Sequence, residues 1–171
     1  TEEDLWKRFD KVINEYPVIL STTHSLRNCI PDNLLIDYLI IDEASQVDIL
    51  TGALALSCAK NVVIVGDLMQ LTNVVSEEDR EISKKIFDTY KLNEAYDFSS
   101  NNLLSSIISL NKDIKKTLLK EHYRCHPKII NFCNKEFYND ELIILTEEKE
   151  GDSPLVLYKT KEGNHARGTI N

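Results

Sequence analysis

The strongest constraint on the fold is a run of apolar residues that ends abruptly in two adjacent carboxylates. The run covers residues 38–41, and Asp42 and Glu43 follow it directly. A short apolar run bounded by polar residues is typical of a strand buried in a parallel sheet. Ligands of such sheets bind at the carboxyl ends of the strands, where Asp42 and Glu43 stand. In the alternative interpretation Ser45 simply caps the next helix, with Asp48 completing a near-capping box, which explains Ser45 but not the paired acids.

Similar patterns on either side of this run predict an α/β layer. Short apolar stretches indicate strands, and apolar residues three or four positions apart indicate helices. Three such strands with helices between them are typical of a doubly wound sheet. The predicted strands are residues 18–23, 38–41 and 61–67, and the predicted helices before and between them are residues 1–15, 24–29 and 46–59. Farther on we expect helices at residues 77–90, 101–110 and 127–138 and short strands at residues 117–121 and 155–158.

The composition limits the class of protein. A net charge of −8 argues against a generally basic surface that coats nucleic acid, so any nucleic-acid contact must be local. No apolar run is long enough to span a membrane, and no signal-peptide pattern opens the chain. The cysteines are widely spaced and contain no Cys-x-x-Cys pair. This spacing suits free thiols in a reducing compartment, so we expect a cytoplasmic protein, or a nuclear one in a eukaryote.

An apolar strand that ends in Asp-Glu is the Walker B arrangement. In that arrangement the first acid, here Asp42, holds Mg²⁺ through water, and the second, here Glu43, orients the water that attacks a phosphoryl group. Gly66 and Asp67 end the next predicted strand, so their loop is expected at the same sheet edge. Gln70 in that loop offers a donor and an acceptor for a γ-phosphate or a water. Gly66 permits a tight exit from the strand. The alternative is an ordinary strand end followed by a turn of the kind that Gly-Asp commonly forms.

Three segments in this order resemble motifs II, III and IV of superfamily 1 helicases. They are Asp42-Glu43-Ala44-Ser45, Gly66-Asp67-x-x-Gln70-Leu71 and Tyr123-Arg124-x-His126-Pro127. The continuation through residues 127–138 to Leu142 is similar to the Upf-like branch, whose members translocate 5′ to 3′ on single-stranded RNA or DNA. The resemblance covers roughly residues 17–145.

The resemblance implies a role for each matching residue. Asp42 would coordinate Mg²⁺, and Glu43 would activate water. Gln70 would sense the γ-phosphate, Tyr123 would stack on the adenine, and Arg124 would reach the γ-phosphate as an arginine finger. These roles suit a carboxylate pair, an amide, an aromatic ring and a planar guanidinium. An ordinary packing pair between domains is the alternative for Tyr123 and Arg124.

Thr22 and Thr23 correspond to a family segment that touches the nucleic-acid backbone. Their hydroxyls suit phosphate contact and also plain helix capping. A different cluster, formed by His122, Cys125, His126 and Cys133, lacks a recognised zinc spacing, so we do not expect a metal there.

The resemblance implies an incomplete RecA-like parallel sheet flanked by helices in residues 1–121, followed by the beginning of a second RecA-like domain in residues 122–171. Residues 77–98 are expected to be an insertion. No glycine precedes Asp42, so the phosphate-cradling Gly-x-x-x-x-Gly-Lys-Ser/Thr loop of the family is missing. Gly163 and Gly168 have the right spacing, but Thr169 stands where the lysine is needed. We therefore expect a fragment that is inactive by itself.

The leading hypothesis is part of an ATP-dependent helicase or translocase that uses ATP and Mg²⁺ and moves on single-stranded DNA or RNA. A non-catalytic interaction module on a helicase-like scaffold is the alternative, although a scaffold does not need the combination of Asp42, Glu43, Gln70 and Arg124. An unrelated phosphotransferase or ATPase would leave the segment at residues 123–127 without a role.

Overall fold

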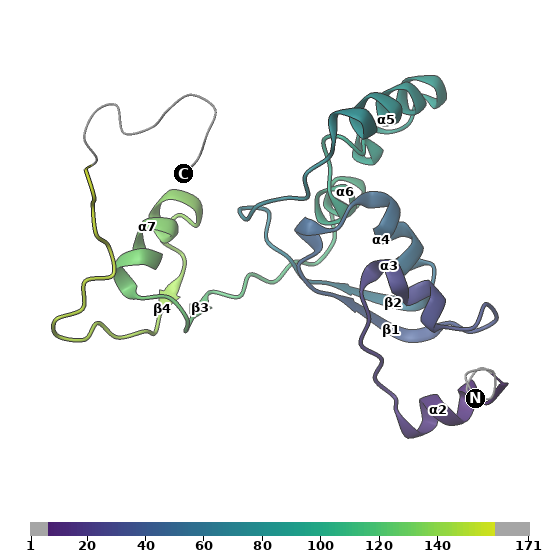
Figure 1. The fold of residues 1–171 in the computed structure, drawn as a ribbon, viewed down its shortest axis with the longest axis horizontal. Helices are drawn as coiled ribbons and strands as arrows, with labels where there is room; N and C mark the ends of the chain where they lie inside the picture. The colour runs from purple at the N-terminus through teal and green to yellow at the C-terminus, as the bar shows by residue number, and fades with distance from the viewer. Residues whose placement is uncertain (1–6, 160–171) are drawn as a thin grey trace. The chain divides into compact units, whose positions relative to one another are not determined.

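The computed structural model describes residues 7–159 and divides the chain into two compact units, Thr1–Ile114 and Lys115–Asn171 (Figure 1). Leu5 and Trp6 of the first predicted helix, and Gly163, Gly168 and Thr169, lie outside the described residues. None of the helices within residues 7–159 is long and apolar enough to cross a membrane. The assignment of residues 1–121 and 122–171 to two RecA-like domains stays a prediction.

The first unit is built on two parallel strands. Strand β1 (Ile36–Ile41) pairs with β2 (Ala59–Ile64), with Ile36 opposite Ala59 and Ile41 opposite Ile64. Parallel strands need a crossover connection, which here contains the 3-10 helix η2 (Ala44–Gln46) and the helix α4 (Ile49–Leu56). The structure confirms a mixed α/β fold with parallel pairing, although residues 7–159 do not form a complete RecA-like sheet.

Helices cover one face of the β1–β2 pair. Leu39 and Ile41 point into a core that also contains residues of α4 and of three other helices, α3 (Thr23–Leu26), η1 (Arg27–Cys29) and α6 (Leu103–Leu110). Tyr38 and Ile40, which alternate with them along β1, are 69% and 67% exposed. A doubly wound layer covers both faces, so only half of the expected layer is present in the described residues.

The predicted strand at residues 18–23 is wrong. The chain is irregular up to Thr22, with Val18 and Leu20 74% and 92% exposed, and α3 begins at Thr23. The predicted strand at residues 155–158 is also wrong, since these residues are irregular and exposed. An apolar run forms a strand only where a neighbouring strand supplies backbone partners and another layer covers its side chains. Neither is available to these runs in the described part of the chain.

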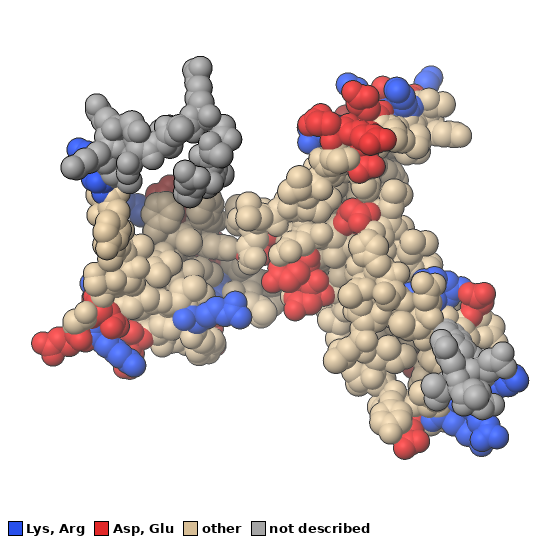
Figure 2. Space-filling model, in the orientation of Figure 1, with Lys and Arg blue, Asp and Glu red and all other residues tan. Residues whose placement is uncertain are grey.

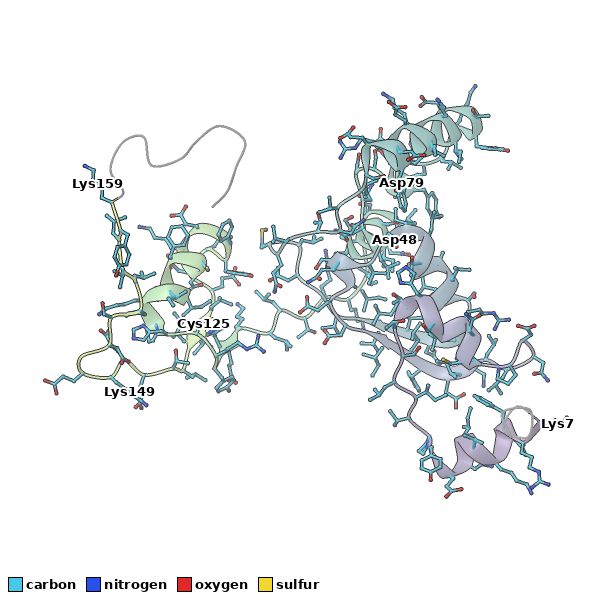
Figure 3. All side chains as sticks on the ribbon, viewed as in Figure 1. Lys7, Asp48, Asp79, Cys125, Lys149 and Lys159 are labelled. Atoms are coloured by element: carbon cyan, nitrogen blue, oxygen red, sulfur yellow. The ribbon has the colours of Figure 1, made fainter. Side chains whose placement is uncertain are left out.

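The predicted helix at residues 46–59 is shorter and has a different cap. Asp48, labelled in Figure 3, accepts a hydrogen bond from the backbone nitrogen of Thr51 at 2.9 Å and so caps α4. Ser45 lies inside η2 and is fully buried. The interpretation of Ser45 as the N-cap is therefore wrong, because the chain makes one tight turn before the helix starts.

Three predicted helices are confirmed. Helix α5 (Glu77–Tyr90) has Ser76 as its N-cap and acids in its first turn, which favour a helix start. It contains no buried residue and carries both acidic and basic side chains (Figure 2). Helix α6 begins at a capping box formed by Asn102 and Ser105. The third, α7 (Pro127–Phe137), has proline in its first turn. Two further elements of the first unit are α2 (Phe9–Glu15) and η3 (Glu94–Tyr96).

The second unit packs α7 beside a short parallel pair. Strand β3 (Glu121–His122) pairs with β4 (Ile143–Ile144), so the strand predicted at residues 117–121 is reduced to its end. Asn134 of α7 is buried and bonds both backbone groups of Leu142, accepting from its nitrogen at 2.9 Å and donating to its oxygen at 3.2 Å. This double contact joins α7 to the start of β4.

Because helices cover only one face of β1, truncating the neighbouring residues Ile41 and Ile40 should have different effects on stability. We expect Ile41→Ala to lower the free energy of unfolding by about 2–5 kcal/mol, because it removes a buried side chain and leaves a cavity. Ile40→Ala is the matched control and should cost about 1 kcal/mol or less, since its side chain is exposed. Urea unfolding followed by circular dichroism measures both. Equal losses for the two variants would contradict this account of the core.

Candidate functional site

The backbone brings the ends of β1 and β2 together. The nitrogen of Val65 donates to the oxygen of Ile41 at 2.8 Å, and the nitrogen of Ala44 donates to the oxygen of Val65 at 2.9 Å. Pairing therefore continues beyond both strands. As a result, the loop that carries Asp42 and Glu43 lies beside the loop that begins at Gly66.

Gly66 is required by this close approach. A Cβ atom at this position would lie 3.1 Å from the nitrogen of Ala44, 3.2 Å from that of Ser45 and 3.0 Å from Leu104 Cδ2. Backbone atoms held in a sheet cannot move away cheaply, so a larger residue would push the two loops apart. The φ of Gly66 lies outside the left-handed region, so glycine is needed at this strand exit because of the limited space and not because of backbone conformation.

The two acids differ in backbone conformation. Asp42 is exposed, and its Oδ1 accepts a hydrogen bond from the nitrogen of Glu43 at 2.9 Å. Glu43 is left-handed, with φ 52° and ψ 40°, and its oxygen accepts from the nitrogen of Gln46 at 2.8 Å. Such a conformation costs a residue other than glycine about 1–3 kcal/mol and is often found at functional sites. The surrounding pairing thus holds Glu43 in an unusual orientation.

Asp67 orients Gln70 and was not foreseen as a site residue. Its Oδ1 accepts from the nitrogen of Met69 at 2.9 Å, and its Oδ2 accepts from Gln70 Nε2 at 3.2 Å. The amide nitrogen of Gln70 is thereby engaged, while Oε1 receives no hydrogen bond from residues 7–159. The signal in the sequence was an aspartate at the end of a predicted strand, because aspartate commonly bonds the backbone two residues on, here at Met69.

Ser45 is buried, which was not expected from its interpretation as a helix cap. Its side chain is 0% exposed, and its Oγ has no hydrogen-bond partner within the described residues. A buried hydroxyl without a partner is unfavourable, so Ser45, two residues after Glu43, is an unexplained polar group in the core. No pattern in the sequence distinguishes it from a helix cap.

Tyr123 and Arg124 lie in the second unit, between β3 and α7. The ring of Tyr123 is 67% exposed, and its hydroxyl donates to the Glu121 carboxylate. This hydrogen bond raises the pKa of the Tyr123 hydroxyl above its ordinary value. Arg124 is exposed, and its guanidinium makes no ion pair or hydrogen bond with the part of the chain that is described. An exposed aromatic ring and a free planar cation are thus available to a ligand.

Thr22 acts as a helix cap. Its Oγ1 accepts a hydrogen bond from the nitrogen of Ser25 at 3.2 Å, and Thr23 is the first residue of α3. The capping interpretation therefore accounts for the Thr22 hydroxyl. A contact of Thr22 or Thr23 with a nucleic-acid backbone stays a prediction.

Both histidines of the His/Cys cluster accept hydrogen bonds from backbone nitrogens of the second unit. His122 Nε2 accepts from the nitrogen of Cys125 at 2.8 Å, and His126 Nδ1 accepts from the nitrogen of Lys128 at 3.1 Å. Cys125 and Cys133 are free thiols. Among residues 7–159 no three His, Cys, Asp or Glu side chains are grouped so that they could hold a metal ion.

Comparison with known proteins gives two consecutive family matches. One model, described as an AAA domain, matches residues 2–78, and a second, also described as an AAA domain, matches residues 99–167. Residues 79–98, which contain most of α5, lie between them.

Two curated relatives are named uncharacterized ATP-dependent helicases. That of Mycoplasma genitalium is 28% identical over 166 residues, which are 92% of this chain and 14% of the relative. That of Methanocaldococcus jannaschii is 28% identical over 137 residues, which are 80% of this chain and 18% of the relative. The chain thus spans less than a fifth of the length of these relatives. The two AAA-domain matches are typical of Upf-like superfamily 1 helicases, and the chain is homologous to proteins named uncharacterized ATP-dependent helicases.

Proposed function

We propose that this chain contributes the metal and water site, and the opposing arginine, of an ATP-driven helicase or translocase. The observation that carries the proposal is the juxtaposition of two strand ends, with the left-handed Glu43 beside the loop that begins at Gly66. Under this proposal the β1–β2 pair and its helices are part of a RecA-like sheet. The enzymatic activity belongs to the full-length protein.

Asp42 is the proposed Mg²⁺ ligand. Its Oδ1 is used by the Glu43 nitrogen, whereas its Oδ2 has no hydrogen bond from residues 7–159 and the side chain is exposed. A free, hard carboxylate oxygen beside water is the kind of donor that Mg²⁺ accepts, since this ion keeps several of its waters. When bound, Mg²⁺ neutralises charge on the phosphates of ATP.

Glu43 is the proposed base for the attacking water, and Gln70 is its partner. Glu43 presents an exposed carboxylate from a constrained backbone, which limits the ways in which it can turn. Asp67 holds the Gln70 amide nitrogen, so Oε1 is left to accept a hydrogen bond from water. Two acceptors can orient one water for attack and take its proton.

Tyr123 and Arg124 are proposed to bind the nucleotide from a second RecA-like domain. The exposed ring of Tyr123 can stack on adenine, and its hydroxyl is held by Glu121. The unpaired guanidinium of Arg124 can bind phosphate oxygens in a fork and stabilise the charge that develops in the transition state.

Single-stranded DNA or RNA is the proposed nucleic acid along which the full-length protein moves. The net charge of −8 means that this chain can contact it only locally, with Thr22 and Thr23 as proposed contacts. The basic surface that a nucleic acid requires must come mainly from other parts of the full-length protein.

The base role of Glu43 is tested by Glu43→Gln in the full-length protein. We expect ATP turnover to fall about 100-fold or more, because the amide cannot accept a proton, while nucleotide binding persists. Glu81→Gln is the matched control, since Glu81 lies on exposed α5 between the two family matches. Steady-state ATPase assays and nucleotide titration measure both. Full turnover in Glu43→Gln would refute the base role, and absent turnover in the unmodified protein would favour the interaction module.

The orienting role of Asp67 is tested by Asp67→Asn. The neutral side chain would turn an amide donor toward the Gln70 amide nitrogen, so the charge-assisted hydrogen bond is lost. We expect ATP turnover to fall about tenfold, which corresponds to the loss of one such bond. Thermal unfolding of the same samples controls for stability. If ATP turnover in Asp67→Asn equals that of the unmodified protein while Gln70→Ala is strongly impaired, Gln70 is oriented by other contacts.

A further inference from the structure

The turn that carries Tyr123 and Arg124 is closed by a histidine. His122, the last residue of β3, accepts at Nε2 a hydrogen bond from the nitrogen of Cys125 at 2.8 Å. Accepting at Nε2 requires the neutral ring with its proton on Nδ1. The side chain of His122 thus spans Tyr123 and Arg124 and fixes the ends of the turn to each other.

A threonine holds the same turn from the other side. Thr146 Oγ1 donates to the oxygen of Cys125 at 2.7 Å. Thr146 is half-buried and follows β4, whose pairing with β3 continues as the nitrogen of Leu145 donates to the oxygen of His122 at 3.0 Å. Both backbone polar groups of Cys125, which is labelled in Figure 3, are therefore bound by side chains from the two neighbouring strand ends.

The segment after β4 makes further contacts with the start of α7. Lys128 forms an ion pair with Glu148, and His126 Nε2 lies 3.6 Å from Asp152 Oδ2. His126 also caps α7 through Lys128. The chain on both sides of Cys125 is therefore anchored, from β3 through the first turn of α7.

The side chains at the tip of this anchored turn are left open. Tyr123 is 67% exposed, and the guanidinium of Arg124 makes no hydrogen bond or ion pair with the described residues. A backbone fixed by surrounding contacts beneath free functional groups is the arrangement that precise ligand contact requires. Neither His122 nor Thr146 has a role in the chemistry proposed above.

We propose that His122 and Thr146 are positioning residues that fix the Tyr123-Arg124 turn for ATP hydrolysis. This inference rests on the proposed function of Arg124. Because Arg124 acts on charge that develops in the transition state, loosening the turn should lower kcat more than it changes KM.

The test compares substitutions that remove each contact with substitutions that keep it, in the full-length protein. Thr146→Val removes the hydroxyl at nearly constant shape, and Thr146→Ser retains it. His122→Leu removes the acceptor, and His122→Gln retains one. For each variant, kcat and KM for ATP are measured together with hydrogen exchange at the Cys125 amide, and thermal unfolding confirms that the variant is folded.

We expect the Val and Leu variants to lose about tenfold in kcat at nearly unchanged KM, with faster exchange at the Cys125 amide, and the Ser and Gln variants to recover kcat. Unchanged kcat in the Val and Leu variants, with Arg124→Ala impaired, would overturn the positioning roles and leave the function of Arg124 intact. So would equal losses in the Val and Ser variants. Unchanged kcat in Arg124→Ala would overturn the function of Arg124, and the positioning proposal with it.

Discussion

The parallel pairing of β1 with β2 is the interaction on which the first unit depends. It buries Leu39 and Ile41 against the helices, and its continuation from Ala44 to Val65 brings the loops after both strands into contact. The close approach at Gly66 follows from this pairing, because there is no room for a Cβ atom between the loops. The left-handed conformation of Glu43 is tolerated for the same reason: hydrogen bonds on either side of it fix the chain. The core and the candidate site therefore share one cause.

The site itself is held by local hydrogen bonds from side chains to the backbone. Asp42 and Asp67 each accept from a nearby backbone nitrogen in the first unit, and His122 and Thr146 bind the two backbone groups of Cys125 in the second. Each such bond contributes about 0.5–1.5 kcal/mol, so no single one dominates the stability of the fold. Their effect is to limit how the loops can move. Exposed functional groups can thus be held in place without being buried.

The sequence was informative where a pattern had a local cause. Helix α5 has the bounds predicted for it, and in the structure a serine cap and three acids mark its start. The adjacency of the Asp42 and Gly66 loops followed from the geometry of parallel strands. The apolar run at residues 18–23 was misread because pairing depends on a neighbour that the run itself does not reveal. The buried Ser45, the left-handed Glu43 and the role of Asp67 depend on contacts between loops, which spacing along one chain does not encode.

The candidate functional residues of the two units carry opposite charges. Asp42 and Glu43 place two exposed carboxylates next to each other, and they would repel a nucleotide phosphate unless a cation lies between them. Arg124 is a cation that finds no carboxylate within its own unit's described residues. Phosphoryl transfer needs both kinds of group, an acid pair to hold the metal and water and a guanidinium to stabilise the transferred charge. Under the proposed function these groups lie on separate units, so ATP hydrolysis would depend on how the units are brought together, and this dependence would couple hydrolysis to movement.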